Sequence, residues 1–370
     1  MYFHNARAPC PQAWWKVWRS ITRDRERIGM NQTPSHADVT LNTARGVAAS
    51  LPHLLGFHPR ESLICLWMRN GMLVVTQRAD LPELAEPVLD EDAAKYVHAY
   101  FAAARNAAAD EVVAVIVDGR EAIVIAVLQA LLDILAPMPV RLRSMLVVQG
   151  SQVRDVIRED GQWEWIDAKS RQYAGAAIGG REPALSRDRI ASECDPAPDH
   201  IVAESHLGTL DAQSIIEATC ALIDFIDEAG EGRHLADLGD RTLRDACSGR
   251  VGRDIVLWWA ARAESSERHR LLEALMRCTR STPLGAAGHV AAAASAVAWM
   301  CGDGVRANVA LDRCLLDDPD NRMGDLLATA IATGIPPTSV SEWLGSVEWS
   351  VLCTWDHAGA SGSFMDEQAS

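Results

Sequence analysis

The hydrophobic pattern of this chain changes near residue 167, and this change constrains the fold more than any single motif. Before it, strand-like and helix-like stretches alternate, whereas beyond about residue 200 every strong apolar period is helical. The run of Val, Ala and Ile at residues 112–117 is typical of a central strand covered on both faces. We therefore predict an α/β N-terminal half, a mixed sheet with flanking helices, followed by an all-α helical bundle.

Two turn signals predict hairpins in the N-terminal half. Asn70-Gly71 separates strands predicted at 62–68 and 72–78, and this dipeptide favours a type I′ turn because both central positions need positive φ. Asp160-Gly161 predicts a second hairpin, with Trp163 and Trp165 on one face.

Other segments of this half have helical spacing. Helices are predicted at 43–55, 90–109 and 121–135, although the triplet Ile123-Val124-Ile125 leaves a strand open within the last of these. A further strand is predicted at 141–148. Helices between some strands and hairpins between others imply a mixed sheet.

The length of 370 residues is enough for two domains. Gly and Pro residues are frequent between the two patterned regions and indicate a linker. We expect the following organisation: a basic leader at 1–29, a mixed α/β domain at 38–166, a linker with short helices at 167–200, an all-α domain at 201–350 and a tail at 351–370.

The leader has six basic and two acidic residues. Its tryptophans at 14, 15 and 18 could form a short amphipathic helix on a membrane surface or a partner. The alternative is that the leader is a mis-called or disordered start and that translation begins at Met30. We favour the second interpretation because the patterned sequence begins only after Met30.

Composition excludes several classes of function. The formal charge is −15, which disfavours nucleic acid and anionic membranes as partners, and no apolar run is long enough to span a membrane. Nine cysteines without a C-x-x-C pair favour a reducing cytoplasm. Because nucleotide-binding and hydrolase motifs are also absent from the sequence, we expect no cofactor.

Four residues are candidates for a ligand site in the α/β half: His53, His58, Asp80 and Asp118. They flank turns at predicted strand ends, where ligand sites of α/β sheets gather, and a His/Asp pair there could perform acid–base chemistry. The structural alternative is that His53 packs in the last turn of a helix and His58 bonds a carbonyl group. No spacing motif supports catalysis.

A second polar group lies in the linker region and comprises Cys194, Asp195, His200, Glu204 and His206. Its spacing matches no familiar metal signature, and the neighbourhood is rich in proline. We expect no metal site here.

Residues 291–319 resemble one tetratricopeptide-like hairpin. Gly302, Ala307 and Pro319 fit the small–small–proline frame of that repeat, but Ala298 stands where the repeat prefers a large aromatic residue. No second copy follows at a period of 34 residues, so an ordinary helical hairpin explains the segment equally well.

Two longer motifs resemble an actinobacterial family called domain of unknown function 4192. The first is Leu51-Pro52-His53-Leu54-Leu55-Gly56-Phe57-His58-Pro59 before a hydrophobic strand. The second runs from Ala298-Trp299 through Gly302-Asp303-Gly304 and 307–313 to Asp318-Pro319, and Ile335-Pro336-Pro337 with Trp343 extends it. The resemblance covers about 39–345.

The family name implies no activity. Members often have a Cys-rich segment after the tryptophan hairpin, but here Trp165 continues directly into Ile166-Asp167, so no role of that segment is carried over. Within the second motif, Trp299, Asp303, Asn308 and Asp312 are candidates for contacts with a partner.

We expect a binding or regulatory protein whose all-α domain contacts a protein partner and whose α/β domain binds a small ligand or a second partner. The alternative is an enzyme with a His/Asp site at the strand ends.

Overall fold

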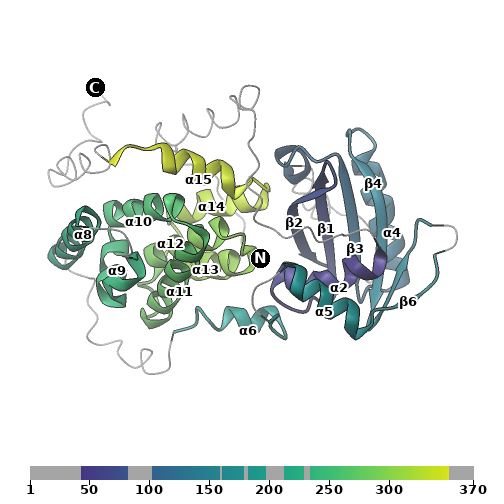
Figure 1. Cartoon of the computed structure of the whole chain (residues 1–370), viewed down its shortest axis with the longest axis horizontal. Helices are drawn as coiled ribbons and strands as arrows, with labels where there is room; N and C mark the ends of the chain where they lie inside the picture. Colours follow the sequence, from purple (N-terminus) through teal and green to yellow (C-terminus); the bar gives the residue numbers. More distant parts are fainter. Residues whose placement is uncertain are drawn as a thin grey trace. The chain divides into compact units, whose positions relative to one another are not determined.

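A computed structural model describes residues 43–81, 102–158, 161–178, 182–196, 212–228 and 234–349. The predictions for the leader, for most of the helix at 90–109 and for the tail fall outside these residues. Within them, the N-terminal half has a six-stranded sheet and the C-terminal half is helical (Figure 1). No helix of the described part is long and apolar enough to cross a membrane.

The sheet is mixed, as predicted. Its strand order is β2-β1-β3-β4-β5-β6, in which β3 and β4 run parallel and every other neighbouring pair is antiparallel. The strands are β1 (Ser62–Arg69), β2 (Met72–Asp80), β3 (Glu111–Val117), β4 (Arg141–Gln149), β5 (Gln152–Asp155) and β6 (Glu164–Trp165).

The first hairpin has the backbone that its sequence predicts. Asn70 and Gly71 both have positive φ, at 52° and 76°, as a type I′ turn requires. The strands β5 and β6 also pair antiparallel around the segment that contains Gly161. A third hairpin, between β4 and β5, turns at Gly150 with φ of 57° and was not predicted.

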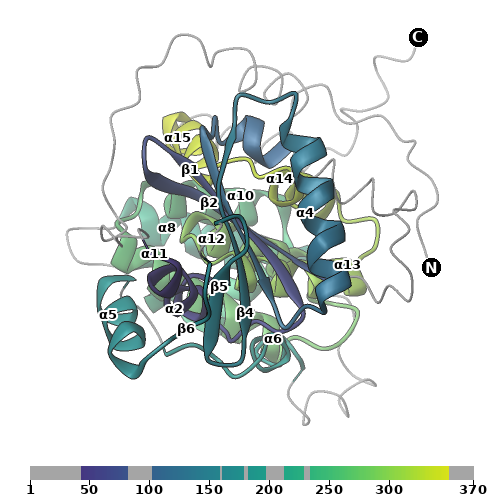
Figure 2. The ribbon, with the colours of Figure 1, turned by 90° about the vertical axis from the view of Figure 1, so that its right-hand side faces the viewer.

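Helices cover both faces of the sheet. Alternate residues of the strands point to opposite faces, so Ile64 packs with α2 (Ala44–Leu55), whereas Cys65 and Trp67 pack with α4 (Glu121–Leu135). The helix α5 (Ala168–Ile178) packs on α2, and Figure 2 shows α4 on the other side of the sheet. Because α4 connects the parallel strands β3 and β4, the ambiguity over residues 121–135 resolves to a helix.

The C-terminal half is helical throughout its described residues. After the short α6 (Arg187–Ala191), its elements are α8 (Ala212–Asp227), the 3₁₀ helix η3 (Leu235–Leu238), α9 (Asp240–Ser248), α10 (Arg250–Arg262), α11 (Ser265–Ser281), α12 (Gly288–Met300), α13 (Gly304–Asp317), α14 (Arg322–Ala332) and α15 (Pro337–Ser346).

The helices α12 and α13 form a helical hairpin, and its tetratricopeptide-like character stays a prediction. Gly302 has φ of 78° in the turn, and Ala307 is fully buried. The hydroxyl of Ser295 on α12 donates to the carbonyl of Ala307 on α13 over 2.8 Å, which requires the two backbones to lie close together.

Buried hydrophobic residues form two clusters. One lies between the sheet and α4, and the other extends from α2 and the opposite face of the sheet, through α6, into the helical half. Residues Asp38–Ser370 make up one compact unit. The division into separately folding domains stays a prediction, which a mutational test below addresses.

Candidate functional site

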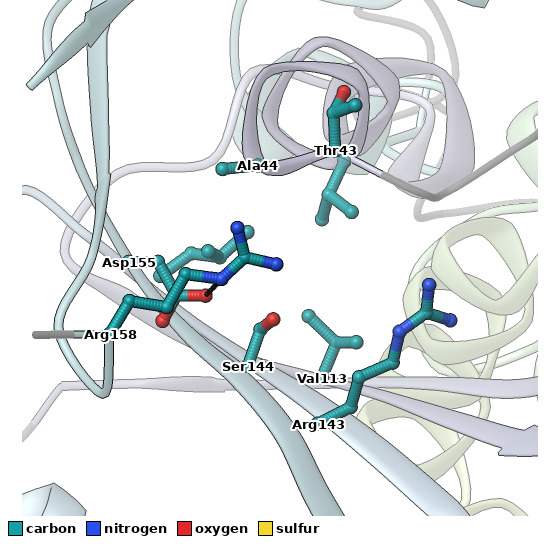
Figure 3. A pocket seen from close by; sticks show the side chains of 9 residues that line it. Thr43, Ala44, Val113, Arg143, Ser144, Asp155 and Arg158 are labelled. Atoms are coloured by element: carbon teal, nitrogen blue, oxygen red, sulfur yellow. Dashed lines mark ion pairs between the residues drawn. The ribbon is translucent and has the colours of Figure 1, made fainter. Parts of the chain in front are cut away.

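A small polar pocket lies between the first turn of α2 and the sheet (Figure 3). Its volume is about 50 Å³, enough for a few water molecules or for one small chemical group. Three strands and one helix contribute to its wall. The lining residues are Thr43, Ala44, Val47, Val113, Arg143, Ser144, Leu146, Asp155 and Arg158.

A local irregularity of β4 brings two polar side chains into this wall. The pairing of β3 with β4 passes from Val112 opposite Leu142 to Val113 opposite Ser144, so Arg143 is an extra residue at a register shift. Such bulges redirect side chains and are frequent beside functional sites. Here the shift allows the consecutive residues Arg143 and Ser144 to line the same pocket.

Asp155 holds the second arginine of the pocket. Its carboxylate is buried, and one oxygen accepts from the backbone nitrogens of Met145 and Ile157 over 3.4 and 3.3 Å. The other oxygen lies 3.4 Å from Nε of Arg158. Figure 3 shows the guanidinium groups of Arg158 and Arg143 reaching the pocket from two sides.

The α2 helix begins over this pocket. The hydroxyl of Thr43 accepts from the backbone nitrogen of Gly46 over 3.0 Å and caps the helix. The N–H groups of a first helical turn carry partial positive charge, which favours an anion nearby. Two guanidinium groups, two hydroxyl groups and a helix start give the pocket donors that suit an oxyanion, beside the apolar Val47 and Leu146. Each guanidinium group also has an acidic partner, since Arg143 lies 3.8 Å from Glu111 and Arg158 lies 3.4 Å from Asp155.

The predicted His/Asp residues lie elsewhere. Asp80 pairs with Ser62 at the start of β1, and Ser62 pairs with Val117, which precedes Asp118; both aspartates are therefore at one end of the sheet. Asp80 is exposed and forms an ion pair with Arg78. Asp118 is exposed, and its backbone nitrogen donates to Val148 over 2.9 Å.

The two histidines lie on α2 and just after the turn that ends it. His53 is half-buried against α5, where a Cβ added at Gly175 would lie 2.9 Å from the His53 ring. His58 is exposed, and its backbone nitrogen donates to the carbonyl of Ala184 over 3.0 Å. Among the described residues, no hydrogen bond or ion pair joins either histidine to Asp80 or Asp118. The four residues remain a prediction as a ligand site.

The candidate contact residues of the second motif have partners within the chain. Trp299 is buried. Asp303 caps α13 by accepting from the backbone nitrogen of Arg306 over 3.0 Å. Asn308 donates to Gly304 over 2.7 Å, and the exposed Asp312 pairs with Arg187 over 2.7 Å.

A buried arginine that we did not single out from sequence makes the densest polar contacts of this region. Arg313 bonds the carboxylate of Asp317 over 2.9 Å and the carbonyls of Cys194, Thr282 and Pro283 over 2.9–3.1 Å. Only 4% of its side chain and 1% of that of Asp317 are exposed. The guanidinium group thus joins three separate segments of the chain.

The two motifs meet at residues 182–196, which we call the clamped segment. From the first motif, the carbonyl of Gly56 accepts from Ala184 over 2.8 Å, and His58 donates back to the same residue. From the second, Arg306 forms a two-bond ion pair with Glu193, at 2.7 and 3.1 Å, and Arg313 binds the carbonyl of Cys194. Both motifs therefore have an architectural role.

Most of the described cysteines are buried. All seven are free, and burial raises the pKa of the Cys194, Cys278 and Cys314 thiols to about 12. No group of metal-binding side chains occurs among the described residues. Cys194 is buried, Asp195 is exposed, and His200, Glu204 and His206 fall outside the described residues.

Comparison with known proteins identifies the family. The family model described as domain of unknown function 4192 matches residues 45–338, which include both motifs and most of the described structure. The chain belongs to this family. No curated protein and no solved structure shows significant similarity to it. Membership in domain of unknown function 4192 thus agrees with the resemblance of the two motifs and assigns no activity.

Sequence reasoning missed the pocket residues Arg143, Ser144, Asp155 and Arg158. They come from β4, β5 and the following turn, and no spacing pattern connects them with Thr43. One weak signal was available: Arg141–Val148 starts with two arginines at alternate positions before its apolar run, which a fully buried strand does not need.

Proposed function

We propose that the protein is a binding protein whose α/β half takes up the anionic group of a small ligand in the pocket beneath α2. The observation that carries the proposal is the pair of guanidinium groups, from Arg143 and Arg158, on two sides of one small cavity. A carboxylate or a phosphate accepts several N–H bonds from arginine, and both share this oxyanion chemistry.

The size of the pocket limits what enters it. With about 50 Å³, it holds the anionic group, while the rest of a ligand extends beyond the wall. The carboxylate of Asp155 is bound to backbone nitrogens and to Arg158, so it fixes the arginine and offsets part of its charge. The hydroxyl groups of Ser144 and Thr43 are close enough to line the same space.

The experiment is a calorimetric titration of the full chain with inorganic phosphate and, separately, with acetate. We expect binding of at least one anion, and a loss of at least about tenfold in affinity in Arg143→Gln and in Arg158→Gln. The control is Arg171→Gln, because Arg171 is exposed and bonds Ser151 outside the pocket. Phosphate and acetate distinguish the two ligand classes. Equal affinities in all four proteins, or no heat with either anion, would refute the proposal.

We also propose that the helical half binds a protein partner and that the protein is cytoplasmic. Support for the partner comes from the α12–α13 hairpin, whose small residues allow the close approach that tetratricopeptide-like hairpins use. Support for a reducing compartment comes from the free thiols.

An enzymatic role at the strand ends is supported by the shared sheet end of Asp80 and Asp118. The carboxylate of Asp80 forms an ion pair with Arg78, and among the described residues no hydrogen bond or ion pair joins either histidine to either aspartate, so the anion pocket is the better supported site. A turnover assay becomes informative once a ligand of the pocket is identified.

A further inference from the structure

The outer face of α4 has an uncharged stripe at coiled-coil spacing. Ala122, Ile125, Gln129, Leu132 and Ala136 follow one another at steps of three, four, three and four residues, and all five are exposed. The side chains of Ile125 and Leu132 are 59% and 49% exposed, which is a large fraction for such residues. Steps of this kind place side chains in one narrow line along a helix.

The opposite face of α4 is already used by the core of the α/β half. Val124, Leu131 and Leu135 are buried there, between α4 and the sheet. The helix is therefore apolar on both sides, which is unusual for a surface helix and is typical of one that packs on a second helix.

The order of the residues in the stripe indicates what that second helix is. The stripe reads Ala, Ile, Gln, Leu, Ala. On either side of Gln129 a large aliphatic residue comes first and an alanine second, so the stripe is nearly symmetric about Gln129. An isologous two-fold interface requires this self-complementarity, because residue i meets residue j and j meets i. We propose that two copies of the chain pair through α4, antiparallel, with the two-fold axis at Gln129.

In this arrangement each side chain has a suitable partner. Ile125 faces Leu132 of the second copy, Ala122 faces Ala136, and the two Gln129 amides meet on the axis, where each can donate to and accept from the other. Small residues at both ends allow the helices to approach within about 8–10 Å of each other.

Charge also favours this pairing over the alternatives. The chain has a formal charge of −15, which gives two copies a net repulsion, but the stripe has no ionisable side chain. The neighbouring Asp133 is exposed. An antiparallel pairing displaces the two Asp133 residues by eight positions, about 12 Å along the axis, whereas a parallel pairing would place them side by side.

The length of α4 limits the area of the dimer interface. Its 15 residues extend over about 22 Å, so the interface is smaller than the roughly 1,600 Å² of a standard stable complex. We therefore expect a weak, reversible dimer with a measurable dissociation constant.

Sedimentation equilibrium of the full chain between about 1 and 500 µM measures this constant. Leu132→Glu should weaken the dimer by at least tenfold. Leu185→Glu is the matched control, because Leu185 is 82% exposed on another segment and receives the same charge. Circular dichroism establishes that both variants are folded.

Mixed variants test the antiparallel register. Ile125→Lys mixed with Leu132→Glu should recover a dimer, because the new charges face each other, whereas Ile125→Lys mixed with Ile125→Glu should not. A monomer at every concentration, a dimer that Leu132→Glu leaves intact, or recovery in the second mixture alone would each overturn the proposal.

Discussion

The two family motifs hold the same segment by different means. The first motif pairs its backbone with Ala184 through the carbonyl of Gly56 and the nitrogen of His58. The second uses the guanidinium groups of Arg306 and Arg313 on Glu193 and Cys194. The first motif therefore holds the clamped segment through the path of its main chain, and the second holds it through the identity of two long side chains.

This difference predicts where each motif tolerates substitution. Backbone pairing survives a change of side chain as long as the turn keeps its conformation and its buried anchor, Phe57, stays in the core. A guanidinium group that satisfies several buried carbonyls has no substitute among the other side chains, because its planar donors match the acceptors one by one.

The largest effect is expected for Arg313→Ala. It leaves the buried carboxylate of Asp317 with only the backbone nitrogen of Ala287 as a donor and removes the guanidinium donors from the carbonyls of Cys194 and Thr282, at an expected cost of about 3–5 kcal/mol in the free energy of unfolding. Chemical denaturation followed by circular dichroism measures it. Arg280→Ala, which removes an exposed arginine of α11, is the control and should change stability by less than about 0.5 kcal/mol.

The same variant tests the predicted domains. If the all-α domain folds separately from the α/β domain, Arg313→Ala should give two unfolding transitions, of which only the helical one moves. One cooperative transition that moves as a whole would show instead that the continuous cluster of buried residues joins the halves into one folding unit.

For the first motif, the buried anchor should matter and the histidine should not. Phe57 is 3% exposed, so Phe57→Ala should cost about 3 kcal/mol through lost burial and a cavity. His58→Ala should cost less than about 0.5 kcal/mol, because His58 is exposed and contributes only its backbone to the clamp. Thermal melts of the two variants compare them directly. A larger loss in His58→Ala than in Phe57→Ala would contradict the backbone description of this motif.

Local signals predicted much of the sheet. Asn70-Gly71 fixed the first hairpin through φ alone, and the β-branched run at 112–117 became the central strand β3. The hairpin at Gly150 was missed because β5 has only four residues, most of them polar, and its partner strand seemed complete without it. A strand this short has little hydrophobic pattern, since its side chains alternate between the two faces and only Val153 is apolar.

The pocket could not be predicted for a different reason. Arg143 enters it only because β4 shifts register by one residue, and such a shift follows from the pairing of two strands and not from either sequence. The histidines, by contrast, stand out in a sequence as reactive residues, but His53 packs against α5 and His58 points to solvent. Residue type alone therefore pointed to the histidines and gave no indication of the pocket, whose lining includes neither of them.

Acid should lower the free energy of unfolding through His289, which lies on α12. Burial, and then the nearby Arg253, lower the pKa of His289 below its ordinary 6.5, although Asp318 acts against this. The unfolded chain then binds the proton more readily, so stability is lost as pH falls through 6.5 towards the lowered value. Burial raises the pKa of Asp254 above its ordinary 3.8, and this contribution has the opposite sign. As pH falls from 6.5 towards the lowered pKa, the free energy of unfolding should decrease less steeply in His289→Gln than in the unsubstituted chain. Equal slopes would exclude His289 as the cause of the acid destabilisation.

The smallest effect is expected at the exposed edge of the clamp, where Arg187 pairs with Asp312 over 2.7 Å. With 38% and 66% of these side chains exposed, water screens the pair, and a double-mutant cycle of Arg187→Ala and Asp312→Ala should give a coupling of about 0.5 kcal/mol. Raising the salt concentration should reduce this coupling towards zero, because screened charges lose their attraction within a shorter distance. A coupling comparable to the loss in Arg313→Ala would mean that surface charge, and not the buried guanidinium group, holds the clamped segment.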